Sequence, residues 1–198
     1  MVKNSITTPK RAINLSIAIA LVISLLTFVA APANAVADGT VACSEGGTFT
    51  ITSNVVTGNT GCTGSAVVPE GVTGLGTSFY NSALSSITLP STLVTIGDSA
   101  LRETQLVSVV IPASVTSIGF LSLATRGITS VTFAAGSQLT TIGGDAFQST
   151  RFTSITIPAL VSSIGSTAFL GNVNLVSISF AGTITSGWPW SAPANVQV

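Results

Sequence analysis

The stretch LSSITLPSTLVTIGDSAL, residues 84–101, contains the pattern that decides the fold. Apolar and hydroxyl residues alternate around Ile87 and Leu89, and a proline follows at position 90. Alternation of this kind predicts a short β-strand whose apolar side chains all face one way. Because proline cannot donate to a strand ladder, it marks the end of that strand. Further apolar residues at Leu93 and Ile96 then predict that the chain returns to the same core.

This unit recurs along the chain at spacings of 21 to 24 residues. Its clearest marker is an apolar residue followed by glycine, found at Leu75-Gly76, Ile96-Gly97, Ile118-Gly119, Ile142-Gly143 and Ile164-Gly165. A unit of this length cannot bury its apolar residues alone, so neighbouring units stack and share one core. We therefore predict a repeat solenoid over residues 64–182.

Aligning the units by their spacing arranges the apolar residues in columns. The first columns are the inward-facing strand residues Ile87/Leu89, Val109/Ile111, Val131/Phe133, Ile155/Ile157 and Ile178/Phe180. The second column is Leu93, Val115, Leu139 and Val161, and the Ile of each apolar-glycine pair makes the third. We expect the glycine to permit a backbone turn that a Cβ atom would hinder. N-cap residue types such as Asp98-Ser99 and Asp145 then predict a brief helical or 3-10 turn.

Residues 1–35 are expected to be a secretory signal peptide. Lys3, Lys10 and Arg11 precede an apolar stretch, and Ala33-Asn34-Ala35 supplies a cleavage site of the A-x-A type. An uncleaved membrane anchor is the alternative, because residues 17–31 are strongly apolar and nearly long enough to span a bilayer. Removal of the leader leaves three arginines against six acidic residues, a net charge of −3, and no lysine. The expected location is therefore outside the cell or on its surface.

Cys43 and Cys62 are the only cysteines. In an oxidising compartment we expect them to form a disulfide. Lipid modification of Cys43 is the alternative, but Thr40-Val41-Ala42 lacks the aliphatic residue that begins a lipobox. Between the cysteines, an alternating run over residues 47–52, a break at Ser53-Asn54 and a second run over residues 55–57 predict a hairpin. The disulfide would thus staple a small hairpin over residues 36–63.

The composition argues against an enzyme. The chain contains no histidine, and only 6% of its residues are charged. Histidine is the usual general base and the commonest metal ligand, so we expect no catalytic residues, no metal and no cofactor. The carboxylates are spread over the hairpin and several repeats at no offset that would bring a pair together. A formal net charge of zero gives no indication of the basic surface that binds nucleic acid. Contact with a membrane is expected only through the signal peptide before cleavage.

The order of strand, proline, Ile-Gly and Ala-Phe, at one period, resembles the BspA-type leucine-rich repeat family of bacterial secreted and surface proteins. The resemblance covers residues 64–182 and departs from the pattern at residues 121–124 and at Ala134-Ala135. It implies a right-handed solenoid with a parallel β-sheet on one face, with the stapled hairpin as its N-terminal cap. It also implies a role in adhesion or protein recognition, with an extracellular protein or a cell-envelope component as partner.

Residues between the inward-facing strand positions should point to solvent. They form two columns, Ser86/Thr88, Ser108/Val110, Ser130/Thr132, Ser154/Thr156 and Ser177/Ser179. Such a surface fits simple solvation of a sheet by small β-compatible residues, and it also fits a recognition face. A third interpretation is an ice- or crystal-surface-binding grid, although Val110 interrupts one column. A purely structural role in the cell envelope is a further alternative.

Two features lie outside this pattern. Arg102, Arg126 and Arg151 recur at intervals of 24 and 25 residues and could line one edge of the solenoid, either for a ligand or as a solvated edge. After Gly182 the repeat stops, and residues 183–198 contain Trp188 and Trp190. We expect this tail to cap the last coil, with an exposed binding tip or a linker as the alternatives.

Overall fold

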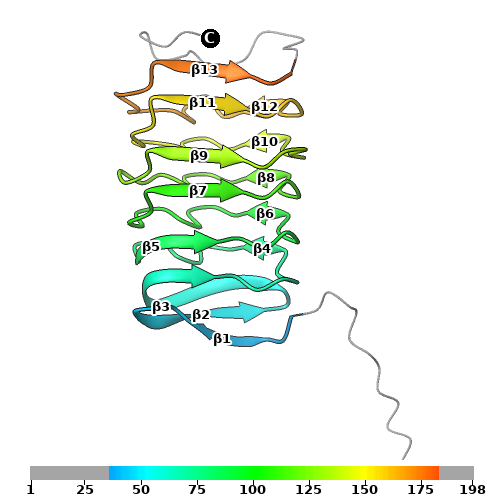
Figure 1. Ribbon diagram of the computed structural model, residues 1–198, viewed down its shortest axis with the longest axis vertical. Coiled ribbons are helices and arrows are strands. Elements are labelled where there is room, and N and C mark those ends of the chain that lie inside the picture. The colour runs from blue at the N-terminus through cyan, green and yellow to red at the C-terminus, as the bar shows by residue number, and fades with distance from the viewer. Residues whose placement is uncertain (1–35, 183–198) are drawn as a thin grey trace, which may run out of the picture. The chain divides into compact units, whose positions relative to one another are not determined.

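The computed structural model describes residues 36–182. The expected signal peptide and the tail with Trp188 and Trp190 lie outside the described residues. Within residues 36–182 the chain forms strands and turns and contains no helix, so that range has no helix able to cross a membrane. The strands stack as successive coils of a β-solenoid, which confirms the predicted fold class (Figure 1).

The first strands form the expected stapled hairpin with one additional strand. Strands β1 (Gly39–Ala42), β2 (Gly46–Thr52) and β3 (Val55–Val67) pair antiparallel in that order. Ser53 and Asn54 make the tight turn between β2 and β3, with φ angles of 51° and 64°. The Cys43–Cys62 disulfide closes this unit, with the two Cα atoms 5.5 Å apart. The hairpin is therefore larger than its sequence pattern indicates, because β3 continues through Gly58-Asn59.

Strand β3 joins the hairpin to the solenoid. Its first residues, Val55 and Val56, pair in parallel with β4 (Gly74–Leu75). Its last five residues, Thr63 to Val67, pair in parallel with β5 (Ala83–Thr88). One long strand thus provides the template for both faces of the first coil.

The longer strands of the coils lie one above another on one face (Figure 1). They are β5, β7 (Ser108–Ile111), β9 (Ser130–Phe133), β11 (Ser154–Ile157) and β13 (Ser177–Phe180). They pair in parallel as three separate ladders, namely β3 with β5, β7 with β9, and β11 with β13. No ladder joins β5 to β7 or β9 to β11. The parallel sheet on this face is therefore divided into three segments.

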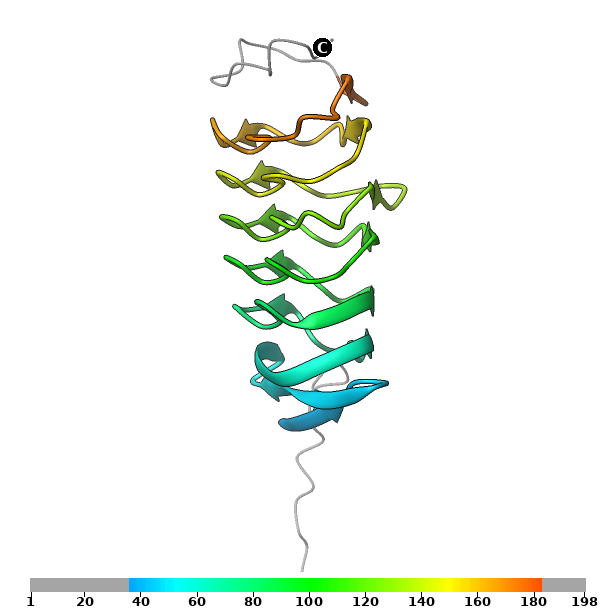
Figure 2. The ribbon, with the colours of Figure 1, turned by 90° about the vertical axis from the view of Figure 1, so that its left-hand side faces the viewer.

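A second, continuous ladder lies behind these strands (Figures 1 and 2). Its members are two-residue strands: β4, β6 (Thr95–Ile96), β8 (Ser117–Ile118), β10 (Thr141–Ile142) and β12 (Ser163–Ile164). They pair in parallel and in register, so that Ile96 is beside Ile118 and Ile142 is beside Ile164. The repeat pattern predicts a core column for these isoleucines but does not indicate that they belong to strands.

The expected helical or 3-10 turns are instead isolated hydrogen-bonded turns. Ala100 donates to the Gly97 carbonyl at 3.3 Å and Arg102 donates to the Ser99 carbonyl at 3.2 Å, but no helix follows. The reason is local, because Ser99, Leu121 and Asp145 have φ angles of 53° to 54°. A residue in this left-handed region cannot continue a right-handed helix.

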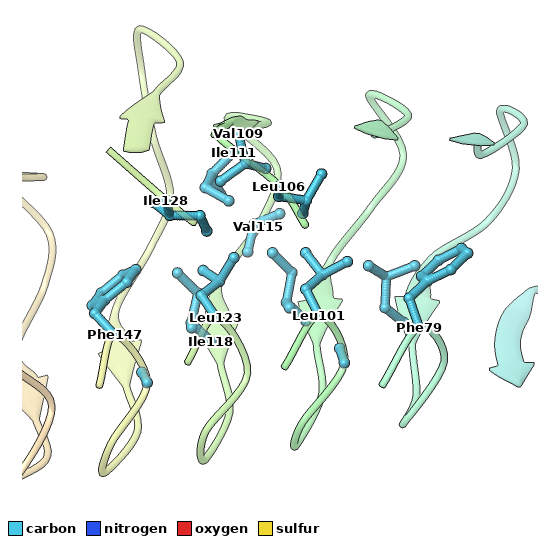
Figure 3. Packing of buried hydrophobic residues seen from close by; sticks show 14 of the residues in the cluster. Phe79, Leu101, Leu106, Val109, Ile111, Val115, Ile118, Leu123, Ile128 and Phe147 are labelled. Atoms are coloured by element: carbon cyan, nitrogen blue, oxygen red, sulfur yellow. The ribbon is translucent and has the colours of Figure 1, made fainter. Parts of the chain in front are cut away.

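The apolar columns form one core. All members of the second and third columns are buried, including Leu93, Val115, Ile96 and Ile118. Among the strand residues, Val109 and Ile111 are buried, whereas Val131 and Phe133 are only partly buried against the core. Figure 3 shows buried side chains of several consecutive coils, with Val109, Ile111 and Val115 close together. Each coil therefore depends on its neighbours for the burial of its apolar residues.

Candidate functional site

The candidate binding face consists of ten outward residues on β5, β7, β9, β11 and β13. Nine of the ten are exposed, and Ser177 is half-buried. The registers place Ser108 beside Ser130 and Val110 beside Thr132, and likewise Ser154 beside Ser177 and Thr156 beside Ser179. The alternation of a strand sends these side chains away from the core. We call this surface the hydroxyl face.

Most hydroxyls on this face have no side-chain partner on the same face. Among the ten residues, the one hydrogen bond within residues 36–182 that joins two side chains links Thr156 and Ser179, at 2.9 Å. Val110 has 59% of its surface exposed and adds an apolar contact point between the serine and threonine positions. The face can thus both donate and accept hydrogen bonds and bury a small apolar group.

Two clefts open where the ladders are interrupted. The break between β9 and β11 contains a cleft of about 560 Å³ lined by Thr132, Phe133, Ser154 and Thr156 and bordered by the loop over residues 134–137. The break between β5 and β7 contains a cleft of about 610 Å³ lined by Thr88, Val110, Leu89 and Glu70. Both clefts are hollows that open widely onto the exposed face. The face is therefore shaped rather than flat.

Glu70 brings a negative charge to the second cleft. One carboxylate oxygen accepts a hydrogen bond from the Ser91 amide at 3.0 Å and the other accepts one from the Ser91 hydroxyl at 2.9 Å. These bonds favour the ionised form and hold the pKa of Glu70 below its ordinary value. The carboxylate thus ties one coil to the next, because Ser91 is 21 residues further along the chain.

All three arginines of the described chain line one further cleft, of about 710 Å³. Arg102 lies 3.0 Å from Glu103, and its guanidinium lies 5.4 Å from the centre of the Tyr80 ring. No ion pair within residues 36–182 involves Arg126 or Arg151, and both are exposed. The structure therefore brings together three residues that the sequence placed only on a common edge. We call this site the arginine cleft.

Several hydroxyls near this cleft are structural. The Thr125 hydroxyl donates to the Thr104 carbonyl at 2.6 Å, and the Thr104 hydroxyl donates to the Leu101 carbonyl at 2.9 Å. Both threonines are buried. These bonds satisfy backbone carbonyls that would otherwise be buried without partners. Their role is to hold the floor of the arginine cleft.

The sequence did not reveal the clefts, Glu70 or Tyr80. The longer interval of 24 residues between Ile118 and Ile142, with its extra residues near Ala134, was the visible signal for the cleft beside β9. Nothing in the repeat pattern indicated the break between β5 and β7. No cluster of three or more potential metal ligands occurs in the part of the chain that the structure describes.

Comparison with known proteins identifies the family. The model of the BspA-type leucine-rich repeat region matches residues 65–187 with six copies. A search among curated proteins finds no match. Among solved structures, the pneumococcal vaccine antigen PcpA is similar with 18% identity and a TM-score of 0.52, over 72% of this chain and 50% of that chain.

A leucine-rich repeat protein from Bacteroides ovatus is also similar, with 22% identity and a TM-score of 0.50. The alignment covers 71% of this chain and 45% of that one. The chain thus corresponds to about half the length of these structures, and the likeness concerns the fold. Since the family model covers more than half of the chain, the protein belongs to the BspA-type leucine-rich repeat family.

Proposed function

We propose that the protein is exported and acts outside the cell as a non-catalytic interaction or adhesion module. The hydroxyl face is its contact surface, and an extracellular protein or a cell-envelope component is its partner. The observation that carries the proposal is the pair of clefts that open on this face beside β7 and β9. A shaped face with hydrogen-bonding rims and apolar floors provides the complementarity that recognition requires.

Two features of the chain support the proposed location. The leader pattern of residues 1–35 supports export, and the Cys43–Cys62 disulfide suits an oxidising compartment. The non-catalytic role is supported by the lack of histidine in the sequence and by the position of Glu70, whose carboxylate is held by Ser91. The interrupted ladders favour a shaped partner over a periodic crystal surface.

The test is capture of a partner by the purified, immobilised protein, followed by cross-linking. One arm offers extracellular host proteins, and the other offers envelope fractions of the producing cell. The double variant Thr132→Arg, Thr156→Arg places two long side chains at the rim of the cleft between β9 and β11. The matched control, Thr95→Arg, Thr141→Arg, changes the same residue type at two exposed positions on the other ladder.

We expect one arm to yield a partner that the control variant retains and the face variant loses. A hot-spot surface that loses its central contacts loses most of its affinity. Equal capture by both variants would contradict the assignment of the face. A partner found only in the envelope arm would indicate a role on the producing cell rather than adhesion to a host.

A further inference from the structure

The arginine cleft contains every positively charged side chain of residues 36–182. Arg102, Arg126 and Arg151 are the only basic residues in this range, which also holds six acidic residues. All three arginines line the same cleft of about 710 Å³, together with a single acid, Glu103. In a range that carries more negative than positive charge, three positive charges and one negative charge therefore gather in one hollow.

Two of the three guanidinium groups are available to a ligand. Arg102 is engaged, because it pairs with Glu103 at 3.0 Å and stacks near Tyr80. Arg126 and Arg151 are exposed and form no ion pair within the described range. A guanidinium presents a planar fork of donors that matches a carboxylate or a sulfate group. The cleft is thus suited to a ligand with at least two anionic groups.

The rest of the lining indicates the chemistry of that ligand. Beside the arginines, the cleft is bordered by polar side chains, Gln105, Gln148 and Ser149, with only Ala124 and Gly127 as small apolar positions. Amide and hydroxyl groups pair with the hydroxyls of a sugar, whereas a peptide with apolar side chains would need apolar pockets for them. The lining favours a hydroxyl-rich ligand.

The cleft continues across coils. A smaller hollow of about 280 Å³ shares Arg126, Ser149 and Arg151 with it and extends to Gly171 and Asn174. The two hollows share lining residues from successive coils, so they form one continuous stretch of surface along the solenoid. An elongated ligand can therefore run from Arg102 towards Asn174.

We propose that the arginine cleft binds an acidic saccharide, a sugar chain that carries sulfate or carboxylate groups. This site is distinct from the hydroxyl face and does not depend on the function proposed for that face. Arg126 and Arg151 bind the anionic groups. Arg102 adds to the positive electrostatic potential of the cleft, whereas the negative charge of Glu103 repels the ligand. The side chains of Gln105, Gln148 and Ser149 contact the sugar hydroxyls.

The test measures binding to the purified exported protein by calorimetry. The probes are a sulfated hexasaccharide, an oligouronate of the same length, a neutral maltohexaose and a hexaglutamate peptide. We expect one or both acidic saccharides to bind and the neutral sugar not to bind. Raising the salt from about 50 mM to about 300 mM should weaken binding, because screening acts on exposed charges.

Variants of the cleft supply the controls. The double variant Arg126→Gln, Arg151→Gln should lose about a hundredfold in affinity, since each charge-assisted contact accounts for about tenfold. Because both arginines are exposed, its melting temperature should stay near that of the wild type. Glu103→Gln should bind more tightly, whereas Glu45→Gln, which makes the same change in net charge at the hairpin, should not.

A gain in affinity with Glu103→Gln but not with Glu45→Gln cannot come from damage to the fold or from the change in net charge alone. The proposal would be overturned by no binding of either acidic saccharide at the lower salt, by unchanged binding by the double arginine variant, or by tighter binding of hexaglutamate than of both saccharides. The last outcome would assign the cleft to acidic peptides. Maltohexaose binding as strong as that of the acidic probes would also refute it.

Discussion

The amide of Gly97 donates a hydrogen bond to the carbonyl oxygen of Leu75 at 2.7 Å, across two consecutive coils. A Cβ atom on Gly97 would lie only 2.6 Å from that oxygen. The φ angle of Gly97 is not in the left-handed region. The glycine is therefore required by the close approach of stacked backbones, and not by the turn predicted from the sequence.

The first prediction concerns this contact. Gly97→Ala should lower the free energy of unfolding by about 1 to 3 kcal/mol, because the coils must separate to admit the methyl group. The control is Gly58→Ala in β3, where a Cβ atom would meet nothing within 4 Å. That change should be neutral or stabilise by up to about 1 kcal/mol, because alanine restricts the unfolded chain. Urea denaturation of both variants measures the difference, and equal midpoints would contradict it.

Most of the fold could be predicted from the period of the repeat. Residues such as Leu93 and Ile118 could be assigned to core columns because each coil places its apolar side chains at the same points in the period. The second ladder was missed because two residues, such as Thr95-Ile96, are too short to show alternation. Its pairing depends on the coil above and the coil below, which local sequence does not encode.

The candidate sites, like the fold, could be predicted only in part. The outward positions of the hydroxyl face follow from strand alternation and could be predicted. The clefts could not, because they arise where strands such as β5 and β7 fail to pair, which is a property of coil stacking. The arginine cleft was only partly visible, because Arg102, Arg126 and Arg151 occupy different positions within their repeats and converge only through the turns between them.

The second prediction concerns the disulfide. Cys43 and Cys62 are 19 residues apart and both are buried. Replacing both by alanine should lower the free energy of unfolding by about 3 kcal/mol, because the open chain gains loop entropy. The measurement is denaturant unfolding of the variant and of the wild type, with and without reductant. If the reduced wild type and the variant are as stable as the oxidised protein, the disulfide contributes nothing to the free energy of unfolding.

The third prediction is a pH dependence at Glu70. Since its hydrogen bonds with Ser91 lower the pKa of Glu70, the ionised carboxylate stabilises the fold above the ordinary carboxyl pKa of about 4.3. That contribution is lost as the pH falls through the lowered pKa. The melting temperature of the wild type should exceed that of Glu70→Gln at neutral pH, and the gap should shrink below about pH 4. Glu45→Gln controls for the loss of one exposed charge. A gap that stays constant down to acidic pH would contradict the assignment.

The fourth prediction concerns the aromatic part of the core. The Phe147 ring stacks on Phe169 with centroids 5.5 Å apart and meets Phe152 edge-on at 6.0 Å. Phe147→Ala should cost about 3 to 5 kcal/mol of unfolding free energy, because it leaves a cavity between coils. Phe120, with 48% of its surface exposed, is the control, and Phe120→Ala should cost much less. Hydrogen exchange should also show faster opening around Phe152 and Phe169 in the Phe147 variant, since each coil is stabilised by its neighbours. Equal losses in the two variants would show that the core of these coils is not organised around the Phe147 ring.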